Sequence, residues 1–518
     1  MANTAVRNVD ETPEAIVIGS GHNGLACACH LAKAGFRVLV LERDDTIGGL
    51  TSTREVTLPG LRHDIHAAGI QLANLSPSIA ELELEERGFE RIYPPLSYVQ
   101  AFPDGRSISF GRDLDETCAE LARFSEKDAE AWRALMADYD ENKEAMVAGI
   151  FSPQPPGPLD PAQFAAFRPF LEQTFDSEEV RAAFAAWALH VGLGPDDEGS
   201  ISGLGFSTII QDTGNNPVKG GMQRLSDALA SFLRDNGGEI ETGAEVEKIL
   251  VEGGRATGVR LADGTERRAS KLVASNANPL LTALEFLGED VVGPDIAAKM
   301  RNLEAGPAQM TIFLALDGPL EYAGGDFAHQ SLYVHACQPS LDSLAQMRDE
   351  VRQGLLPREP LLQIVNEASV DPTRASDGRY TQRILVLPLP YDIKGDATGQ
   401  IPHRNWDEAR EPYADYAIGL AARVAPRIEQ QILKRVVQDP VTMSLERADV
   451  LRGDICHVGC GPGQMGAARP IPEMGQYRTP VPNVYLCGSG SHPGPGVSMG
   501  PGRNAASVIC DDFGVSFP

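Results

Sequence analysis

The chain has 518 residues, of which 42% are hydrophobic and 23% charged; this is a globular composition, long enough for two or three domains. A formal net charge of −27 at pH 7 repels nucleic-acid phosphates and anionic lipid headgroups, which argues against both as partners. No run reaches the ~18 apolar residues of a membrane span, the polar N-terminus has no secretory pattern, and eight cysteines do not make a disulfide scaffold. We therefore expect a cytoplasmic protein with reduced thiols.

The chain opens with the pattern of a β-α-β unit. Residues 14–18 form a short apolar run, which predicts a strand that ends before Gly19. Apolar residues then recur with helical spacing up to Gly35, a residue type that commonly ends helices, and residues 37–41 form a second β-rich run. Because the helix returns the chain to the same edge, the two strands are expected to be parallel.

The turn between the first strand and the helix carries a GxGxxG sequence at Gly19, Gly21 and Gly24. In this position the glycines permit a tight turn, close approach of a pyrophosphate and close packing of helix on strand. The helix N-terminus offers unpaired N–H groups to the phosphates. Glu42 ends the second strand about 20 residues further on, where a carboxylate binds ribose hydroxyls and repels the 2′-phosphate of NADP.

Two further glycine-rich segments favour FAD over NAD. Gly48 and Gly49 follow Glu42 closely and allow the chain to run beside the pyrophosphate and ribityl parts of a longer cofactor. A second loop, residues 488–502, lies near the end of the chain and leads into a helix. One extended cofactor touched by both ends of the chain explains both segments.

Helices and short strands alternate through the next third of the chain. The sequence predicts, in order, a helix at 116–146, a proline-rich loop or lid at 153–161, a helix at 164–190 and, after Gly220-Gly221, a helix at 223–236. Short strands are predicted at 239–241, 246–251, 256–261 and 271–274, the last of them after a turn at Asp263-Gly264.

The remaining part of the chain continues the same alternation. Strands are predicted at 309–316, 383–389 and 484–486, and helices at 406–425, 427–437 and 503–510. No internal repeat of solenoid length is present in the sequence. Cys456 and Cys460 flank His457, but this lone CxxxC lacks a second ligand pair, so no metal site is expected.

Three stretches of the sequence resemble the phytoene-dehydrogenase-like flavoproteins, a branch of the FAD-dependent amine-oxidase superfamily. They are IVIGSGHNGLACACHLAKAGFRVLVLERDDTIGG, then PVKGGMQRLSDALASFLRDNGGEIETGAEVEKIL with LVASNANP, and finally ARPIPEMGQYRTPVPNVYLCGSGSHPGPGVSMGPGRNAA. The third is the most specific, because it joins the RP, YRTP and GxxxHPGxGV elements in family order. Residues 90–210 and much of 290–450 are less recognisable.

The resemblance implies an α/β fold: a Rossmann-type FAD-binding domain of the two-domain p-hydroxybenzoate-hydroxylase and amine-oxidase kind, with an inserted substrate domain of mixed sheet and helices. The FAD-binding domain is expected to be discontinuous and the substrate domain to fill its gaps. The predicted boundaries are 12–90, 212–288 and 451–518 for the FAD-binding domain, and 91–211 and 289–450 for the substrate domain.

The resemblance also implies non-covalent FAD and a set of residues that contact it. The pyrophosphate is expected at Gly19, Gly21, Asn23 and Gly24, and the adenosine ribose at Glu42 and Arg43. The ribityl side is expected at Gly48, Gly49 and Thr51, the ribityl phosphate at Gly488 and adenine at the backbone of Val246, with Asn276 a further cofactor contact. The flavin N1/O2 edge is expected at Val497, Ser498 and Met499, where a helix N-terminus stabilises the anionic reduced flavin.

Histidines are the main candidates for acid–base chemistry. His66 lies with His63 just after the Gly48-Gly49 segment, and His492 lies in the C-terminal glycine loop. Histidine titrates near neutral pH, so we predict His66 and His492 as catalytic residues. His457 is a further candidate, and a purely structural role is the alternative for each of them.

The expected function is that of an FAD-dependent desaturase or dehydrogenase, which removes hydride from a C–H bond of an apolar or cyclic small molecule to form C=C. The alternatives are a flavin-dependent isomerase or saturase and a non-catalytic FAD-binding scaffold. The strongly acidic surface argues against docking on membranes and against a full-length carotenoid. Oxygen and a quinone are both candidate electron acceptors, and a homodimer is one candidate assembly.

Overall fold

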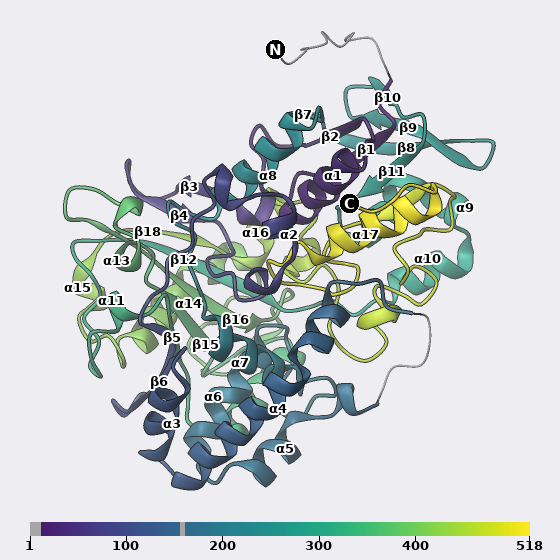
Figure 1. Cartoon of the computed structure of the whole chain (residues 1–518). Coiled ribbons are helices and arrows are strands. Elements are labelled where there is room, and N and C mark those ends of the chain that lie inside the picture. Colours follow the sequence, from purple (N-terminus) through teal and green to yellow (C-terminus); the bar gives the residue numbers. More distant parts are fainter. Residues whose placement is uncertain (1–11, 156–160) are drawn as a thin grey trace.

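The computed structural model describes residues 12–155 and 161–518 (Figure 1). Its first sheet has five parallel strands in the order β19-β11-β1-β2-β7. These strands are β1 Ala15–Ile18, β2 Val38–Leu41, β7 Glu239–Glu241, β11 Leu272–Ser275 and β19 Val484–Leu486. The sheet therefore draws its strands from three distant parts of the sequence, as a discontinuous Rossmann-type domain requires.

Both faces of this sheet are covered, as is usual for parallel sheets. Ala15 and Val17 of β1 pack into one core with α1 His22–Lys33, α8 Gln223–Asp235 and α17 Gly500–Asp512. In Figure 1 the purple α1 and the yellow α17 lie side by side. Ile16 and Ile18 face a second core, to which β8 Val246–Glu252 and β9 Arg255–Leu261 contribute. These two strands form an antiparallel sheet with β10 Glu266–Arg268.

The second large sheet has seven strands in the order β18-β12-β16-β15-β13-β5-β6, and only the β13–β5 pair is parallel. Its strands are β5 Leu96–Ala101, β6 Ser107–Gly111, β12 Ala308–Leu316, β13 Tyr333–Ala336, β15 Leu361–Val365, β16 Tyr380–Leu389 and β18 Ile432–Gln438. One face packs on a helical group: α3 Leu114–Ala122, α4 Glu126–Ile150, α5 Phe167–Thr174, α6 Glu178–Leu189, α7 Ser202–Thr213 and α12 Leu341–Arg352. The other face packs on α14 Trp406–Ala421.

Short elements connect these layers. The strands among them are β3 Thr53–Glu55, β4 Arg62–Asp64, β14 Leu355–Leu356 and β17 Gly395–Asp396. The short helices include α2 Ser78–Glu81, the π-helix η5 Leu281–Gly288, α9 Glu289–Val292, α10 Pro294–Arg301, α11 Phe327–Gln330, α13 Glu367–Val370, η6 Pro372–Arg374, α15 Ile428–Gln431 and α16 Pro440–Glu446. Within the described residues, no helix combines the length and apolarity that crossing a bilayer requires.

Three sequence-based element predictions were wrong, two for local reasons and one because of long-range strand pairing. The helix expected at 116–146 is two helices, because Ser125 adopts an extended conformation and caps α4 by accepting the N–H of Asp128. The helix expected at 164–190 is likewise divided, with Ser177 capping α6. The helix expected at 427–437 is wrong from residue 432 onward, where the chain forms the edge strand β18, whose pairing with β12 overrides the local propensity.

The fold class predicted from the sequence is confirmed. All strands of the five-stranded sheet lie within 12–90, 212–288 and 451–518, and all strands of the seven-stranded sheet lie within 91–211 and 289–450. The division of the chain at those residues stays a prediction. The proline-rich segment at 153–161 falls mostly on residues outside the described part of the chain.

A buried ionic network joins the part of the molecule that holds the five-stranded sheet to the part that holds the seven-stranded sheet. Arg374 contacts Asp64 of β4 at 3.0 Å, and Arg383 of β16 contacts Glu367 of α13 at 2.8 Å. The four side chains are at most 1% exposed. Arg383 also donates to the backbone carbonyl of His66 at 2.9 Å. Two buried carboxylates thus balance two buried guanidinium groups, and the network fixes the segment that carries His66.

We predict that Glu367→Gln lowers the stability of the protein by about 3–5 kcal/mol, because it leaves buried arginine charge uncompensated. Burial opposes ionisation, but Arg383 and Arg374 outweigh it and lower the pKa of Glu367 from 4.5 to about 2. The stabilisation is therefore complete above pH 4.5 and is lost as the pH falls toward 2. Thermal unfolding measured across this pH range should show that the difference in stability between the wild type and Glu367→Gln becomes smaller as the pH falls.

The matched control is Glu321→Gln, which removes an exposed ion pair with Arg427. Exposed pairs contribute about 0–1 kcal/mol, so this variant should unfold near the wild-type temperature at every pH. A deficit of Glu367→Gln that stays constant between pH 7 and pH 3 would contradict the assigned pKa shift.

Candidate functional site

Two glycine positions in the turn from β1 into α1 leave no room for a side chain. A Cβ atom at Gly24 would lie 2.3 Å from the carbonyl oxygen of Gly19, and a Cβ at Gly21 would lie 2.9 Å from the Nδ2 atom of Asn276. Gly19 has φ +88°, in the left-handed region that favours glycine. The three glycines therefore let strand, helix and the segment after β11 meet at backbone distance.

We call the place where β1, α1 and the segment after β11 meet the glycine crossing. The C-terminal glycine loop joins this crossing from the other end of the chain. A Cβ at Gly488 would lie 2.4 Å from the carbonyl oxygen of Asn276, and one at Gly502 would lie 2.0 Å from that of Asn23. The side-chain amide of Asn23 donates to the hydroxyl of Ser489 at 3.1 Å. Both chain ends thus contribute to one site.

Glu42 lies at the end of β2, facing this crossing. One of its carboxylate oxygens accepts the N–H of Ser20 at 2.8 Å and the Ser20 hydroxyl at 2.5 Å. The other accepts the N–H of Asp44 at 2.9 Å. The carboxylate is therefore held in place by its own turn, at the edge of a cavity where a diol can reach it.

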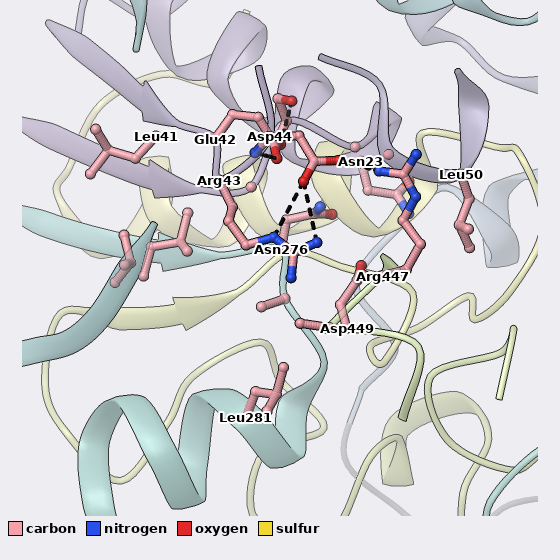
Figure 2. Close-up of a pocket in the computed structure, with 18 of the residues that line it drawn as sticks. Asn23, Leu41, Glu42, Arg43, Asp44, Leu50, Asn276, Leu281, Arg447 and Asp449 are labelled. Carbon is pink, nitrogen blue, oxygen red and sulfur yellow. Dashed lines mark hydrogen bonds and ion pairs between the residues drawn. The ribbon is translucent and has the colours of Figure 1, made fainter. Parts of the chain in front are cut away.

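A cavity of about 300 Å³ follows the crossing. Figure 2 shows Glu42, Arg43 and Asn276 converging on it, with Leu281 of η5 on the opposite wall. Arg447 also lines the cavity and forms an ion pair with Asp44. Four further residues line the cavity: Leu281, Phe286, Arg447 and Asp449. No sequence motif indicated them, because they lie far from the glycine motifs in the sequence.

A second cavity of about 170 Å³ adjoins the first, and both are lined by His22, Leu50 and Ser489. Apolar and aromatic side chains form much of its wall: Trp187, Val191, Phe206, Tyr333, Leu385, Ile455 and Val497. Polar side chains also line it: His22, Thr51, His66, Gln71, His190, Asn215, Gln309, Gln363 and Ser489. An extended molecule bound in the first cavity would therefore reach a second space of mixed polarity.

The histidines of the second cavity are neutral bases at physiological pH. Burial, and then the nearby Arg383, lower the pKa of His66 to about 3. Burial lowers the pKa of His190 and of His22 to about 4. Gln309 pairs with Nδ1 of His66 at 2.9 Å, so one ring nitrogen is engaged and the ring orientation is fixed.

The predicted site residues fall into three groups. Those that line the first cavity are Gly19, Gly21, Asn23, Glu42, Arg43, Gly49, Val246 and Asn276. Those that line the second are Thr51, His66 and Val497. Those that line neither are Gly24, Gly48, Gly488, Ser498, Met499 and His492. The cofactor contacts themselves stay predictions.

The third group supports the crossing or lies behind it. Gly48 forms an isolated β-bridge with Gly21, and its N–H donates to the Ser20 carbonyl at 3.2 Å. The Nε2 atom of His492 lies 2.9 Å from the carbonyl oxygen of Gly149, so that nitrogen is occupied by the backbone, and a catalytic role of His492 stays a prediction. Met499 caps α17 with φ +63°.

The first cavity fits an extended dinucleotide. Gly21 supplies no side-chain cap to α1, so the first N–H groups of the helix have no intrahelical acceptor and are available to phosphate. The Oδ1 atom of Asn23 is buried and has no hydrogen-bond partner among the described residues. Such groups are satisfied when a ligand supplies the missing partner. The site is therefore that of a dinucleotide-binding protein.

The chain belongs to the family described as flavin containing amine oxidoreductase, whose model matches residues 24–347. The match supplies the identity of the dinucleotide: the cofactor is FAD. The preference for FAD over NAD that the second glycine pair indicated is thereby confirmed.

Relatives match along nearly the whole chain. Pyridine nucleotide-disulfide oxidoreductase domain-containing protein 2 of Mus musculus is 30% identical, over 96% of this chain and 94% of its own. A limonene dehydrogenase subunit of Castellaniella defragrans is 26% identical over 97% and 95%. A phytoene desaturase (neurosporene-forming) of Cereibacter sphaeroides is 27% identical over 95% and 93%. The resemblance to phytoene-dehydrogenase-like flavoproteins is confirmed.

A solved structure shares the fold. An oxidoreductase from Methanosarcina mazei superposes with a TM-score of 0.64 at 20% identity, and the match covers 96% of this chain and 99% of the other. Both the parallel sheet and the seven-stranded sheet therefore belong to a known arrangement.

We predict that Glu42→Ala weakens FAD binding by about 1.5–3 kcal/mol, the contribution of a hydrogen bond to a charged group. This corresponds to roughly 10–100-fold in Kd. Titration of the apoprotein with FAD, followed by flavin fluorescence, measures the change. Glu239→Ala, an exposed glutamate on β7, is the control and should bind FAD like the wild type. Equal affinities for both variants would show that Glu42 does not contact the ribose.

We further predict that Gly496→Val lowers the FAD content of the purified protein. Gly496 has φ +107°, and a Cβ there would lie 2.6 Å from Cδ1 of Leu72, so valine adds both backbone strain and a clash beside the second cavity. Gly399 has φ +73° with no atom within 4 Å of the Cβ position, so Gly399→Val carries strain alone. The flavin-to-protein absorbance ratio should fall for the first variant only.

Proposed function

We propose that the protein is an FAD-dependent desaturase or dehydrogenase that removes hydride from a C–H bond of a small apolar or cyclic molecule and leaves a C=C bond. It is an oxidoreductase of the flavin containing amine oxidoreductase family. The observation that carries the finer proposal is the second cavity, which adjoins the cofactor cavity at His22, Leu50 and Ser489.

The lining of the second cavity supports a small substrate with a largely apolar body. Thr51 and Val497, which are expected to contact FAD, line the same cavity, so on this proposal the substrate lies beside the flavin end of the cofactor. Phe206, Val191 and Leu385 supply an apolar wall. The names of two relatives, the limonene dehydrogenase subunit and the phytoene desaturase, point to apolar substrates and support the same class.

The residues of the second cavity suit this reaction. Bound FAD supplies the hydride acceptor. Departure of hydride from an allylic carbon leaves a delocalised cation, whose neighbouring C–H is strongly acidic, so that a weak base suffices to complete the desaturation. We propose His66 as this base: its imidazole is neutral and its backbone carbonyl is held by Arg383. In the tautomer that acts as a base, Nδ1 carries the proton and donates to the amide oxygen of Gln309, whose side-chain amide lies beside it, and Nε2 accepts the proton of the substrate. The substrate thus loses one hydride and one proton.

Two alternatives remain distinct from this proposal. A flavin-dependent isomerase or saturase would use the same cavity without net oxidation of the substrate. A non-catalytic FAD-binding scaffold would need no cavity beside the cofactor, and the second cavity argues against it. Reoxidation of the enzyme by oxygen or by a quinone, and non-covalent retention of FAD, are parts of the same proposal.

The test is anaerobic mixing of the oxidised holoenzyme with a panel of small cyclic hydrocarbons, including limonene. Bleaching of the flavin absorbance together with a product two hydrogens poorer supports the desaturase. A product of unchanged mass with the flavin still oxidised supports the isomerase. An enzyme that neither bleaches nor converts any member of a broad apolar panel contradicts an enzymatic role of this kind. Acid precipitation should release the flavin to the supernatant.

We predict that the rate of flavin reduction depends little on pH between 5 and 8, because the protonation state of His66 does not change in this range. Its pKa of about 3 keeps the imidazole neutral throughout that range. His66→Asn should lower the rate at which the desaturated product forms by about 10²-fold or more, the usual contribution of a general base, while FAD content stays unchanged. Product formation in acid-quenched single turnovers of both proteins measures this loss, and stopped-flow reduction measures the pH dependence. A wild-type rate that rises tenfold from pH 5 to 7 would place the base elsewhere.

A further inference from the structure

Two adjacent asparagines after α7 differ sharply in how their side chains are satisfied. Asn215 and Asn216 are each 1% exposed, so both amides are removed from solvent. Of the two, only Asn215 lines the second cavity. The pair allows a comparison of two chemically identical groups in one loop.

Asn216 has structural partners for its whole amide. Its Oδ1 atom accepts from Nδ2 of Asn74 at 2.8 Å, and its own Nδ2 donates to the carbonyl of Ile92 at 3.0 Å. Its backbone carbonyl accepts the N–H of Ile70 at 3.1 Å. Asn216 therefore fixes the path of the loop, and the position of Asn215 follows from it.

Asn215 has no such partners. Both its Oδ1 and its Nδ2 atoms are buried, and neither has a hydrogen-bond partner within residues 12–155 and 161–518. A buried amide without partners is costly to a fold, and such groups in native proteins call for an explanation. Since the loop is already held by Asn216, the fold itself gives no reason for a polar side chain at 215.

The surroundings of Asn215 keep space for the amide. A Cβ atom at Gly69 would lie 2.2 Å from Oδ1 of Asn215 and 2.7 Å from the ring of Tyr333. Apolar side chains such as Phe206 and Leu385 line the same cavity. The amide thus adds one donor group and one acceptor atom to a wall that also carries apolar side chains.

We propose that Asn215 binds an oxygen atom of the substrate, so that the substrate is a small apolar molecule carrying one hydroxyl or carbonyl group. A carbonyl oxygen accepts from Nδ2, and a hydroxyl group can pair with either atom. This inference rests on the proposed function, because it assigns the second cavity to the substrate. It adds what an apolar cavity alone does not specify, namely the orientation of the substrate.

The experiment measures binding without turnover. Holoenzyme is titrated with cyclohexanol, cyclohexanone and methylcyclohexane, and binding is read from perturbation of the flavin absorbance. The wild type should bind at least one oxygenated probe on the order of tenfold or more tightly than methylcyclohexane, because a buried polar group is otherwise left unpaired. Asn215→Leu should abolish this preference, and Asn215→Ser should restore part of it. The better of the two oxygenated probes identifies the group.

Stability supplies a second readout that needs no ligand. Asn215→Leu, which replaces an unpaired amide by an apolar group of similar size, should leave the melting temperature unchanged or raise it. Asn216→Leu should lower the melting temperature, because it removes partners from Asn74 and Ile92.

Three results would overturn the proposal. One is a wild type with no preference for either oxygenated probe. Another is an Asn215→Leu variant that keeps the wild-type preference. The last is an Asn215→Leu variant with altered FAD affinity or flavin spectrum in the absence of any probe, which would assign the amide to the flavin. Because no turnover is required, a failure of the desaturase proposal is recognised separately, by the absence of flavin reduction.

Discussion

The cofactor half of this protein depends on three backbone segments meeting where no Cβ fits. Gly24 lies against the carbonyl of Gly19, Gly488 against that of Asn276, and Gly502 against that of Asn23. Any larger residue at these points would separate α1, β11 and α17, and the cavity between them would lose its shape. The helix N-terminus, the Glu42 carboxylate and the Asn23 amide are in range of a single ligand only because this crossing is tight.

The buried network of Asp64, Glu367, Arg374 and Arg383 joins the cofactor part of the molecule to the part built on the seven-stranded sheet. Replacing such a network by apolar residues often costs little, so burial of four charges is not in itself a route to stability. Here the network does something that apolar packing does not: Arg383 binds the backbone of His66, and Asp64 accepts the N–H of Met222 at the start of α8. Directional hydrogen bonds thereby fix the segment that places His66 in the wall of the second cavity.

What could be predicted well from the sequence was local. The strand, glycine turn, helix, strand and acid of residues 14–42 lie in one continuous stretch, and each carries its own pattern. The break between α3 and α4 was missed although Ser125 and Asp128 have the spacing of a helix cap, a signal that the sequence does carry. The strand β18 could not be found, because its conformation is set by pairing with β12 more than a hundred residues earlier. Arg447 and Asn215 were out of reach for the same reason: nothing in their neighbourhoods distinguishes them until the folded chain brings them to a cavity.

The five-stranded sheet also has a consequence for how the protein is made. Its central strand β1 is synthesised first, while its edge strand β19 and the covering helix α17 come from the last part of the sequence printed here. At ribosomal rates of about 5–20 residues per second, on the order of a minute separates the two. During that interval the apolar surface of α1 that α17 covers in the native protein has no partner, whereas all strands of the seven-stranded sheet emerge before the interval ends. Retention of FAD is therefore a late event in biosynthesis. The number of residues between α1 and α17 sets how long the apolar surface of α1 needs protection from aggregation.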